Sequence, residues 1–132
     1  MLPFNVDLKD KVAVITGGGG VLCSMFAKAL GECGAKIAVL DLNLEAAQKT
    51  AGEINKSGGT AKGYGANVLK PDEMKAVRDE IKKDFGICNL LINGAGGNNP
   101  KGTTTKEYLE FEDLKNSEEI TTFFDLDPQG IE

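Results

Sequence analysis

The sequence contains no histidine and only three cysteines among its 132 residues. Histidine is the commonest general base and the commonest metal ligand, so its absence argues against triad hydrolases and most zinc sites, and we expect no metal. The cysteines Cys23, Cys33 and Cys88 form no CxxC pair and lie within apolar segments. We therefore expect buried, reduced thiols and no disulfide framework.

Long apolar runs and an excess of positive charge are also missing. No apolar stretch approaches the roughly 20 residues needed to span a bilayer. Residues 1–7 lack the basic and apolar regions of a signal peptide, which favours a cytoplasmic location. The formal net charge of −5 argues against nucleic acid or an anionic membrane as a partner. The composition thus predicts a small soluble domain.

Short apolar runs alternate with longer segments of helical periodicity. The pattern predicts strands over 12–16, 36–40, 60–64 and 88–92, and helices over 21–33, 44–56 and 71–85. Apolar strands that alternate with amphipathic helices imply a doubly wound, parallel α/β sheet covered on both faces. We expect such a sheet to be incomplete, with about four strands.

The chain is expected to divide after Gly97. Residues 1–97 form the predicted βαβαβαβ unit, and residues 98–132 form a loop or insertion leading to the start of a further helix at Asp127 and Pro128. The loop either lines a substrate pocket or is an acidic surface segment. Within the first unit, the helix over 21–33 is expected to bury its larger apolar side chains, which are Leu22, Met25, Phe26, Leu30 and Cys33, together with Ala29.

Four consecutive glycines, Gly17 to Gly20, join the first predicted strand to the first predicted helix. Bare backbone N–H groups and the positive end of a helix dipole meet at such a turn, which makes it a candidate site for the pyrophosphate of a dinucleotide. A plain turn is the alternative.

Polar residues follow the other predicted strands. Asp41 lies about twenty residues beyond the glycine turn, where a carboxylate accepts hydrogen bonds from ribose hydroxyls and repels a 2′-phosphate. No basic residue is present at Leu42 or Asn43, so NAD is favoured over NADP. Helix capping is the alternative role for Asp41. Asn67 and Asn93 follow the third and fourth strands, and parallel strands bring all these ends to one ligand-binding edge, although each is also ordinary turn chemistry.

These segments resemble the short-chain dehydrogenase/reductase family over residues 8–96, roughly the first half of such a protein. TGGGGVLC (16–23) resembles the family's T-G-x-x-x-G-x-G, and LINGAG (91–96) resembles its N-N-A-G. ANV (66–68) resembles its D-V pair at the adenine. The chain departs from the family at four positions: Val21 and Cys23 replace glycines, Asn67 replaces an aspartate, and Gly94 replaces the second asparagine.

The resemblance implies an NAD(P)-binding Rossmann fold with NAD as cofactor. It implies a cofactor site made of Gly17, Gly19, Gly20, Val21, Leu22, Asp41, Asn67, Val68, Asn93 and Ala95. TGGGGVL, NGAGGNNP (93–100) and FFDLDPQGIE (123–132) are further similar to D-mannonate oxidoreductase (fructuronate reductase)-like members. This similarity implies hydride transfer between a nicotinamide and a sugar acid such as D-mannonate or D-fructuronate.

The family also implies a catalytic serine and a Y-x-x-x-K pair, in which the lysine lowers the pKa of the tyrosine. Tyr64 is followed four residues later by Val68, and Tyr108 by Glu112, so no catalytic residue is expected in this chain. The chain is therefore predicted to be the N-terminal part of a dehydrogenase and inactive by itself. A non-catalytic module that binds NAD or an adenine nucleotide is the alternative, and a purely structural βαβ domain is a third.

An incomplete sheet has a further consequence for association. A fourth strand at the edge would leave apolar backbone unpaired. We therefore expect the chain to form a homo-oligomer or to associate through this exposed sheet edge.

Overall fold

The computed structural model describes residues 6–97, 100–108, 110–115 and 120–127. The chain splits into two compact units, residues 1–95 and 96–132, which we describe separately. The helix start expected at Asp127 and Pro128 lies partly outside the described residues.

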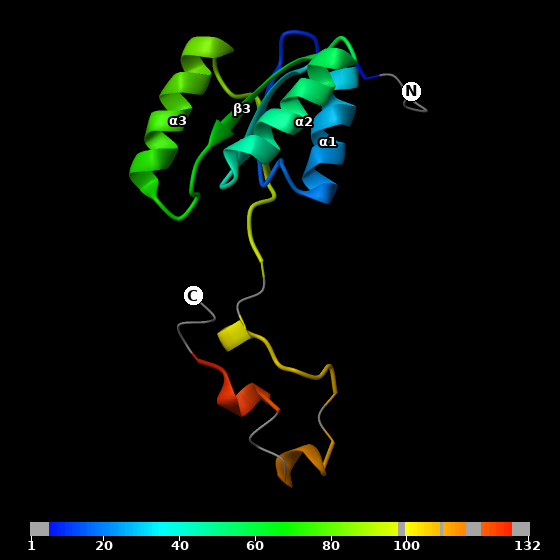
Figure 1. Ribbon diagram of the computed structural model, residues 1–132, viewed down its shortest axis with the longest axis vertical. Coiled ribbons are helices and arrows are strands. Elements are labelled where there is room, and N and C mark those ends of the chain that lie inside the picture. Colours follow the sequence, from blue (N-terminus) through cyan, green and yellow to red (C-terminus); the bar gives the residue numbers. More distant parts are fainter. Residues whose placement is uncertain (1–5, 98–99, 109, 116–119, 128–132) are drawn as a thin grey trace. The chain divides into compact units, whose positions relative to one another are not determined.

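Strands and helices alternate through the first unit (Figure 1). In chain order they are β1 (Val12–Thr16), α1 (Val21–Glu32), β2 (Lys36–Asp41), α2 (Leu44–Lys56), β3 (Thr60–Gly65), α3 (Pro71–Asp84) and β4 (Leu90–Asn93). β4 begins two residues later than predicted because Asn89 is held outside the strand. Its side chain accepts a hydrogen bond from the Val12 N–H (2.9 Å), and its own N–H donates to the Val12 carbonyl (2.9 Å).

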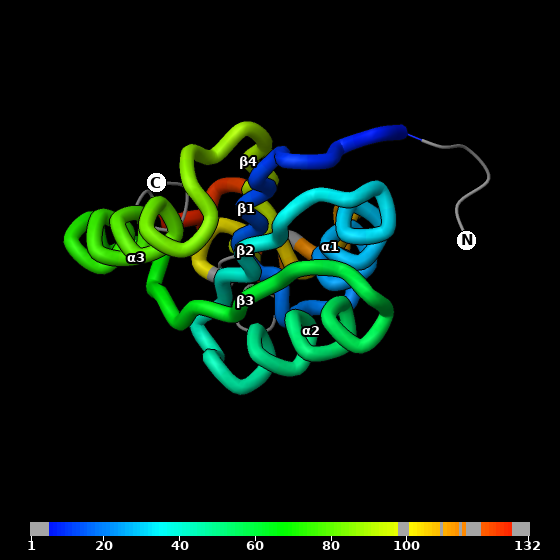
Figure 2. The backbone as a smooth tube through the Cα atoms, turned by 90° about the horizontal axis from the view of Figure 1, so that it is seen from above, coloured from blue at the N-terminus to red at the C-terminus, as the bar shows by residue number. Residues whose placement is uncertain are grey.

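The four strands form one parallel sheet in the order β3-β2-β1-β4. Thr16, the last residue of β1, lies in register with Leu40 of β2 and Asn93 of β4. Viewed from above in Figure 2, α1 and α2 cover one face of the sheet and α3 covers the other. The predicted doubly wound α/β fold is confirmed.

The two central strands supply most of the core, because their side chains are buried on both faces. Ala13, Ile15, Ile37 and Val39 pack toward α1 and α2. Val12, Val14, Ala38 and Leu40 pack toward α3, which contributes Val77 and Ile81. Burying a side chain of the size of Ile15 contributes about 1.5–3 kcal/mol. These two strands therefore fix the position of everything attached to their carboxyl ends.

The predicted buried face of α1 is wrong for Leu22, Met25 and Phe26, which are exposed, and is confirmed in part for Leu30, which packs partly buried against the core. The buried residues of α1 are the small ones, Cys23, Ala27 and Gly31, whereas Leu22 (62%) and Met25 (60%) are exposed. Close packing of α1 against α2 explains the difference, because a Cβ on Gly31 would lie 2.9 Å from Cγ2 of Ile54. Large side chains on this face would push the helices apart.

The cysteines differ in burial more than expected. All three thiols are free. Cys23 is buried, but Cys33 is half-buried and Cys88 is exposed, so the expectation of three buried thiols holds only for Cys23.

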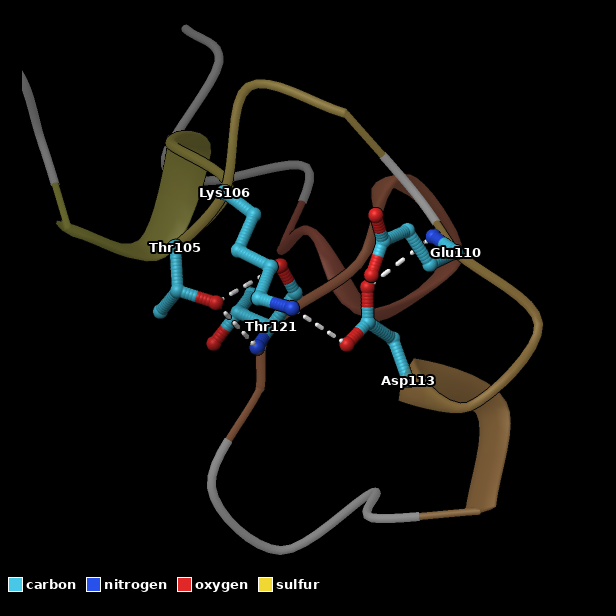
Figure 3. A network of polar contacts seen from close by, with 5 residues as sticks. All are labelled: Thr105, Lys106, Glu110, Asp113 and Thr121. Carbon is cyan, nitrogen blue, oxygen red and sulfur yellow. Dashed lines mark hydrogen bonds and ion pairs between the residues drawn. The ribbon is translucent and has the colours of Figure 1, made fainter.

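The second unit contains short 3-10 turns, which are Pro100–Gly102, Asp113–Lys115 and Phe123–Asp125. Backbone and side-chain hydrogen bonds join Thr105 to Thr121 across this unit (Figure 3). No helix in the described part of the chain is long and apolar enough to cross a membrane.

Candidate functional site

The carboxyl edge of the sheet contains the point where the chain reverses its direction of winding. β2 lies on one side of β1 and β4 on the other, so the strand order reverses between β1 and β4. In open parallel sheets, ligands bind in the crevice at such a switch point. The glycine turn, Asp41 and the segment after β4 all lie at this edge.

The glycine turn connects β1 to an uncapped helix end. Gly17 has φ +66°, a left-handed conformation that favours glycine. Gly18 donates its N–H to the Leu40 carbonyl (2.9 Å), which ties the turn to β2. Gly20 is the N-cap of α1, no side chain caps it, and the first turn of α1 contains no acidic residue. The positive end of the α1 dipole is thus left for another group to complement.

Asp41 closes β2, and one of its carboxylate oxygens holds the glycine turn while the other binds the start of α2. Oδ2 accepts from the Gly19 N–H (3.0 Å), and Oδ1 accepts from the Asn43 N–H (2.9 Å). The N-cap of α2 is Asn43, whose side chain accepts from the Ala46 N–H at 3.2 Å. Asp41 is therefore not the capping residue of α2, and the alternative role considered for it does not apply.

Thr16 connects the glycine turn to the segment after β4. Its buried Oγ1 accepts hydrogen bonds from the N–H groups of Gly94 (3.0 Å) and Ala95 (3.1 Å). A Cβ on Gly17 would lie 2.8 Å from the Gly94 carbonyl oxygen, so the two segments approach at backbone distance. Sequence reasoning did not assign this role to Thr16, although it is the first residue of the quoted T-G motif.

Asn67 and Val68 lie beside Asp41 at the end of β3. The Ala66 N–H donates to the Asp41 carbonyl at 3.0 Å. The Asn67 amide oxygen accepts from the Leu69 N–H (3.0 Å), and the Asn67 N–H donates to Glu73 (2.9 Å). A hydrogen bond from Lys70 and then this N–H lower the pKa of the Glu73 carboxyl. Asn67 is half-buried and Val68 is 40% exposed.

The predicted site residues thus lie along the carboxyl edge of the sheet, but only some of them are linked to one another by contacts. Hydrogen bonds or close approach link Gly17, Gly19, Asp41 and Ala95. Gly20, Val21 and Leu22 form the uncapped start of α1, where Val21 is 86% exposed. Asn93 is exposed at the end of β4, opposite Thr16. The described residues contain no cluster of acidic or cysteine side chains that could hold a metal ion.

Tyr64 does not have the environment of a proton-transferring phenol. Its side chain is buried, and its hydroxyl donates to Asp84 (2.8 Å), which also pairs with Lys62 (2.6 Å). Burial, and then the hydrogen bond to Asp84, raise the pKa of the Tyr64 phenol well above its usual range. The phenol is held as a neutral donor within the fold.

A second polar network lies in residues 96–132 (Figure 3). Lys106 Nζ contacts Oδ1 of Asp113 at 2.6 Å, and the Glu110 N–H donates to Oδ2 of the same carboxylate at 2.9 Å. The hydrogen bond from Lys106 lowers the pKa of Asp113, and the carboxylate raises the pKa of Lys106. A pocket of about 150 Å³ beside it is lined by Thr104, Lys106–Tyr108 and Ile120–Phe123. Because Lys106 is already paired, its charge is largely neutralised.

Comparison with known proteins extends over nearly the whole chain. The family model for the short chain dehydrogenases matches residues 11–127. An uncharacterised oxidoreductase of Haemophilus influenzae is 58% identical over 128 residues, which cover 97% of this chain and 44% of that protein. The chain therefore spans less than half the length of this relative.

Solved structures agree with this match. A candidate D-mannonate oxidoreductase from Haemophilus influenza with bound NAD superposes with a TM-score of 0.83 and 56% identity, over 96% of this chain and 44% of that one. A metagenomic short-chain oxidoreductase in complex with NADP superposes with a TM-score of 0.66 and 27% identity, over 69% of this chain and 41% of that one. On its sequence and its fold, this chain belongs to the short-chain dehydrogenase family.

Proposed function

We propose that the first unit binds NAD and is the cofactor-binding part of an oxidoreductase that transfers hydride between the nicotinamide and a sugar acid. The observation that carries this proposal is the linkage of the glycine turn to Asp41 on one side and to Ala95 on the other. One ligand laid across the switch point would contact all three.

Each part of the dinucleotide has a matching group. The N–H groups of Val21 and Leu22, at the uncapped start of α1, suit the pyrophosphate. The N–H groups of Gly19 and Gly20 donate within the fold, to Asp41 and to the Gly17 carbonyl, so these two glycines are proposed to contribute close backbone approach instead. Asp41 accepts two backbone hydrogen bonds, and a carboxylate has about four lone-pair positions. About two therefore remain for the hydroxyls of the adenosine ribose. Gly17 supports this turn by its close approach to the Gly94 backbone.

The adenine and nicotinamide ends lie on opposite sides of β1 in this proposal. Asn67 and Val68 contact the adenine, because the Asn67 amide oxygen has a second lone pair beyond the one that Leu69 uses. Asn93 and Ala95, at the end of β4, border the nicotinamide side. The sheet order, with β3 at one edge and β4 at the other, supports this division.

NAD is proposed over NADP because neither of the two residues that follow Asp41 is a cation that could bind a 2′-phosphate. The next two residues are Leu42 and Asn43, and Leu42 is 76% exposed. A carboxylate placed beside the phosphate would repel it. Titration calorimetry with NADH and NADPH tests the preference, and equal affinity for both would contradict it.

The substrate proposed is D-mannonate or D-fructuronate, by analogy with the NAD-bound structure described above. Neither Tyr64 nor Tyr108 has a lysine four residues later, so this chain is proposed to be inactive alone. The decisive measurement is NADH oxidation with D-fructuronate by a chain extended past Glu132. If such an extension folds but contains no Y-x-x-x-K, the enzyme proposal fails and a non-catalytic nucleotide-binding module remains.

We also infer that the chain self-associates through the β4 edge. β4 pairs only with β1 among the described strands, and Leu91 within it is 58% exposed. Leu22, Met25 and Phe26 of α1 are exposed apolar side chains as well. Size-exclusion chromatography of the unaltered chain and of Leu91→Lys should show association that the charge weakens. A monomer at high concentration in both cases would contradict the inference.

A further inference from the structure

The side chain of Cys23 occupies the space that a side chain at position 94 would need. A Cβ built on Gly94 would overlap the Cys23 sulfur and would lie 2.8 Å from the Thr16 carbonyl oxygen. Cys23 is 8% exposed, so its sulfur is enclosed rather than free to rotate into solvent. The backbone of Gly94 is not left-handed, so steric contact and not conformation is what requires glycine there.

Both partners of this contact are departures from the family pattern described above. Cys23 adds a side chain where the family has glycine, and Gly94 removes one where the family has asparagine. The two departures meet each other in the structure. Such a large-for-small exchange conserves volume, and volume-conserving exchanges are the ones that packed sites tolerate best.

We propose that Cys23 and Gly94 form a matched positioning pair that sets the distance between the start of α1 and the segment after β4, and so shapes the nicotinamide half of the NAD site. This inference rests on the proposed NAD binding. The sulfur acts through packing alone. Thr16 Oγ1 holds the N–H groups of Gly94 and Ala95 from one side, while Cys23 fills the other.

The position of this pair predicts an effect that differs between ligands. Cys23, in the first turn of α1, and Gly94, directly after β4, meet at the carboxyl ends of β1 and β4, whereas Asp41 ends β2 and Asn67 follows β3. Disturbing the pair should therefore weaken binding of NAD, which crosses the switch point. It should leave binding of adenosine 5′-monophosphate nearly unchanged, because that ligand uses the start of α1 and the β2–β3 side but lacks the nicotinamide half on the β4 side.

The test is a double-mutant cycle in the full chain with Gly94→Ala, Cys23→Gly and the double variant, titrated with NAD and with adenosine 5′-monophosphate. Overpacking by Gly94→Ala should lower NAD affinity about tenfold or more, and should change monophosphate affinity less than about twofold. In the Cys23→Gly background, Gly94→Ala should lower NAD affinity by less than about threefold. Part of the loss persists because Thr16 still crowds position 94.

Matched controls separate positioning from loss of fold. Gly96→Ala, whose Cβ would meet nothing within 4 Å, should leave both affinities unchanged. If Gly94→Ala fails to fold, Cys23→Gly alone must still lower NAD affinity and spare the monophosphate. Additive effects in the cycle, or equal loss of both ligands, would overturn the inference. Failure of the unaltered chain to bind either nucleotide would overturn the proposed function, and the positioning role with it.

Discussion

Replacing Gly17 by alanine should destabilise the first unit more than any ordinary surface substitution. Its φ of +66° places a new side chain in the left-handed region, at a cost of roughly 1–2 kcal/mol. The new Cβ would also lie 2.8–2.9 Å from three backbone atoms of Gly94 and Ala95. Backbone atoms cannot rotate away, so overpacking adds about 1–3 kcal/mol. The expected loss is therefore about 2–5 kcal/mol, a large part of the ~5–15 kcal/mol typical of a domain.

Gly52→Ala is the matched control, because it adds the same methyl group to a glycine that has open space around it. Gly52 lies inside α2, and a Cβ there would meet nothing within 4 Å. Alanine favours the helix interior by about 0.5–1 kcal/mol over glycine. Both substitutions reduce the freedom of the unfolded chain similarly, so their difference reports on the folded state. Gly17→Ala should lower stability and Gly52→Ala should raise it.

Urea denaturation followed by far-ultraviolet circular dichroism measures both changes. The midpoints should move in opposite directions while the slope with urea stays constant. Calorimetric titration of the folded Gly17→Ala variant should also show loss of NAD binding, because the turn and the Gly94 segment would be forced apart. If both variants shift the midpoint in the same direction by similar amounts, the close approach of these two segments is refuted.

Three further outcomes are expected. Asp41→Asn combined with Leu42→Arg should raise the ratio of NADP to NAD affinity about tenfold or more, because a cation replaces the repelling carboxylate. Acid should loosen the second unit: Lys106 lowers the pKa of Asp113, so the pair stabilises above the unfolded value of about 4 and is lost as pH falls through the lower folded value. The amide NMR signals of the second unit should change as this ion pair is lost. The Asp113→Asn variant has no carboxylate at this position, so the acid-dependent change should be absent from its signals. Tyr64→Phe should cost about 0.5–1.5 kcal/mol of unfolding free energy by removing its partly buried hydrogen bond to Asp84.

Each of these outcomes can fail in a recognisable way. An unchanged NADP-to-NAD ratio would mean that Asp41 does not face the ribose. If the NMR signals of the second unit change with acid in Asp113→Asn as they do in the unaltered chain, the Lys106–Asp113 ion pair is not the cause of that change. Equal urea midpoints for the unaltered chain and Tyr64→Phe would show that the phenol hydroxyl contributes nothing net.

The sheet was predictable because each of its central strands is a continuous apolar run followed by Gly or Asp. Residues 12–16 and 36–40 need no partner information to be identified as buried parallel strands. The placement of Gly17, Asp41 and Asn93 at one edge then follows from parallel topology. The strand β3 was the weaker prediction, because its sequence is less apolar, and of its residues only Tyr64 is buried.

The face that α1 buries was not predictable from hydrophobicity. A helix pattern ranks Leu22 and Phe26 above Cys23 and Gly31, yet the small residues are the buried ones. Only the distance between α1 and α2 decides this, and that distance depends on residues more than twenty positions away, such as Ile54. The contact of Cys23 with Gly94 and the hydrogen bonds of Thr16 escaped prediction for the same reason.

The position of β4 also predicts an order in which the strands of the first unit assemble. The hydrogen bond that anchors its start joins residues 77 positions apart in the chain, whereas β1 and β2 lie a single helix apart. Contacts of long sequence separation form late in folding because they close large loops. The β1-α1-β2-α2-β3 segment can thus collapse first, and β4 joins it last. The crevice proposed to hold NAD is then completed only in the final step of folding, and bound NAD would slow its reopening.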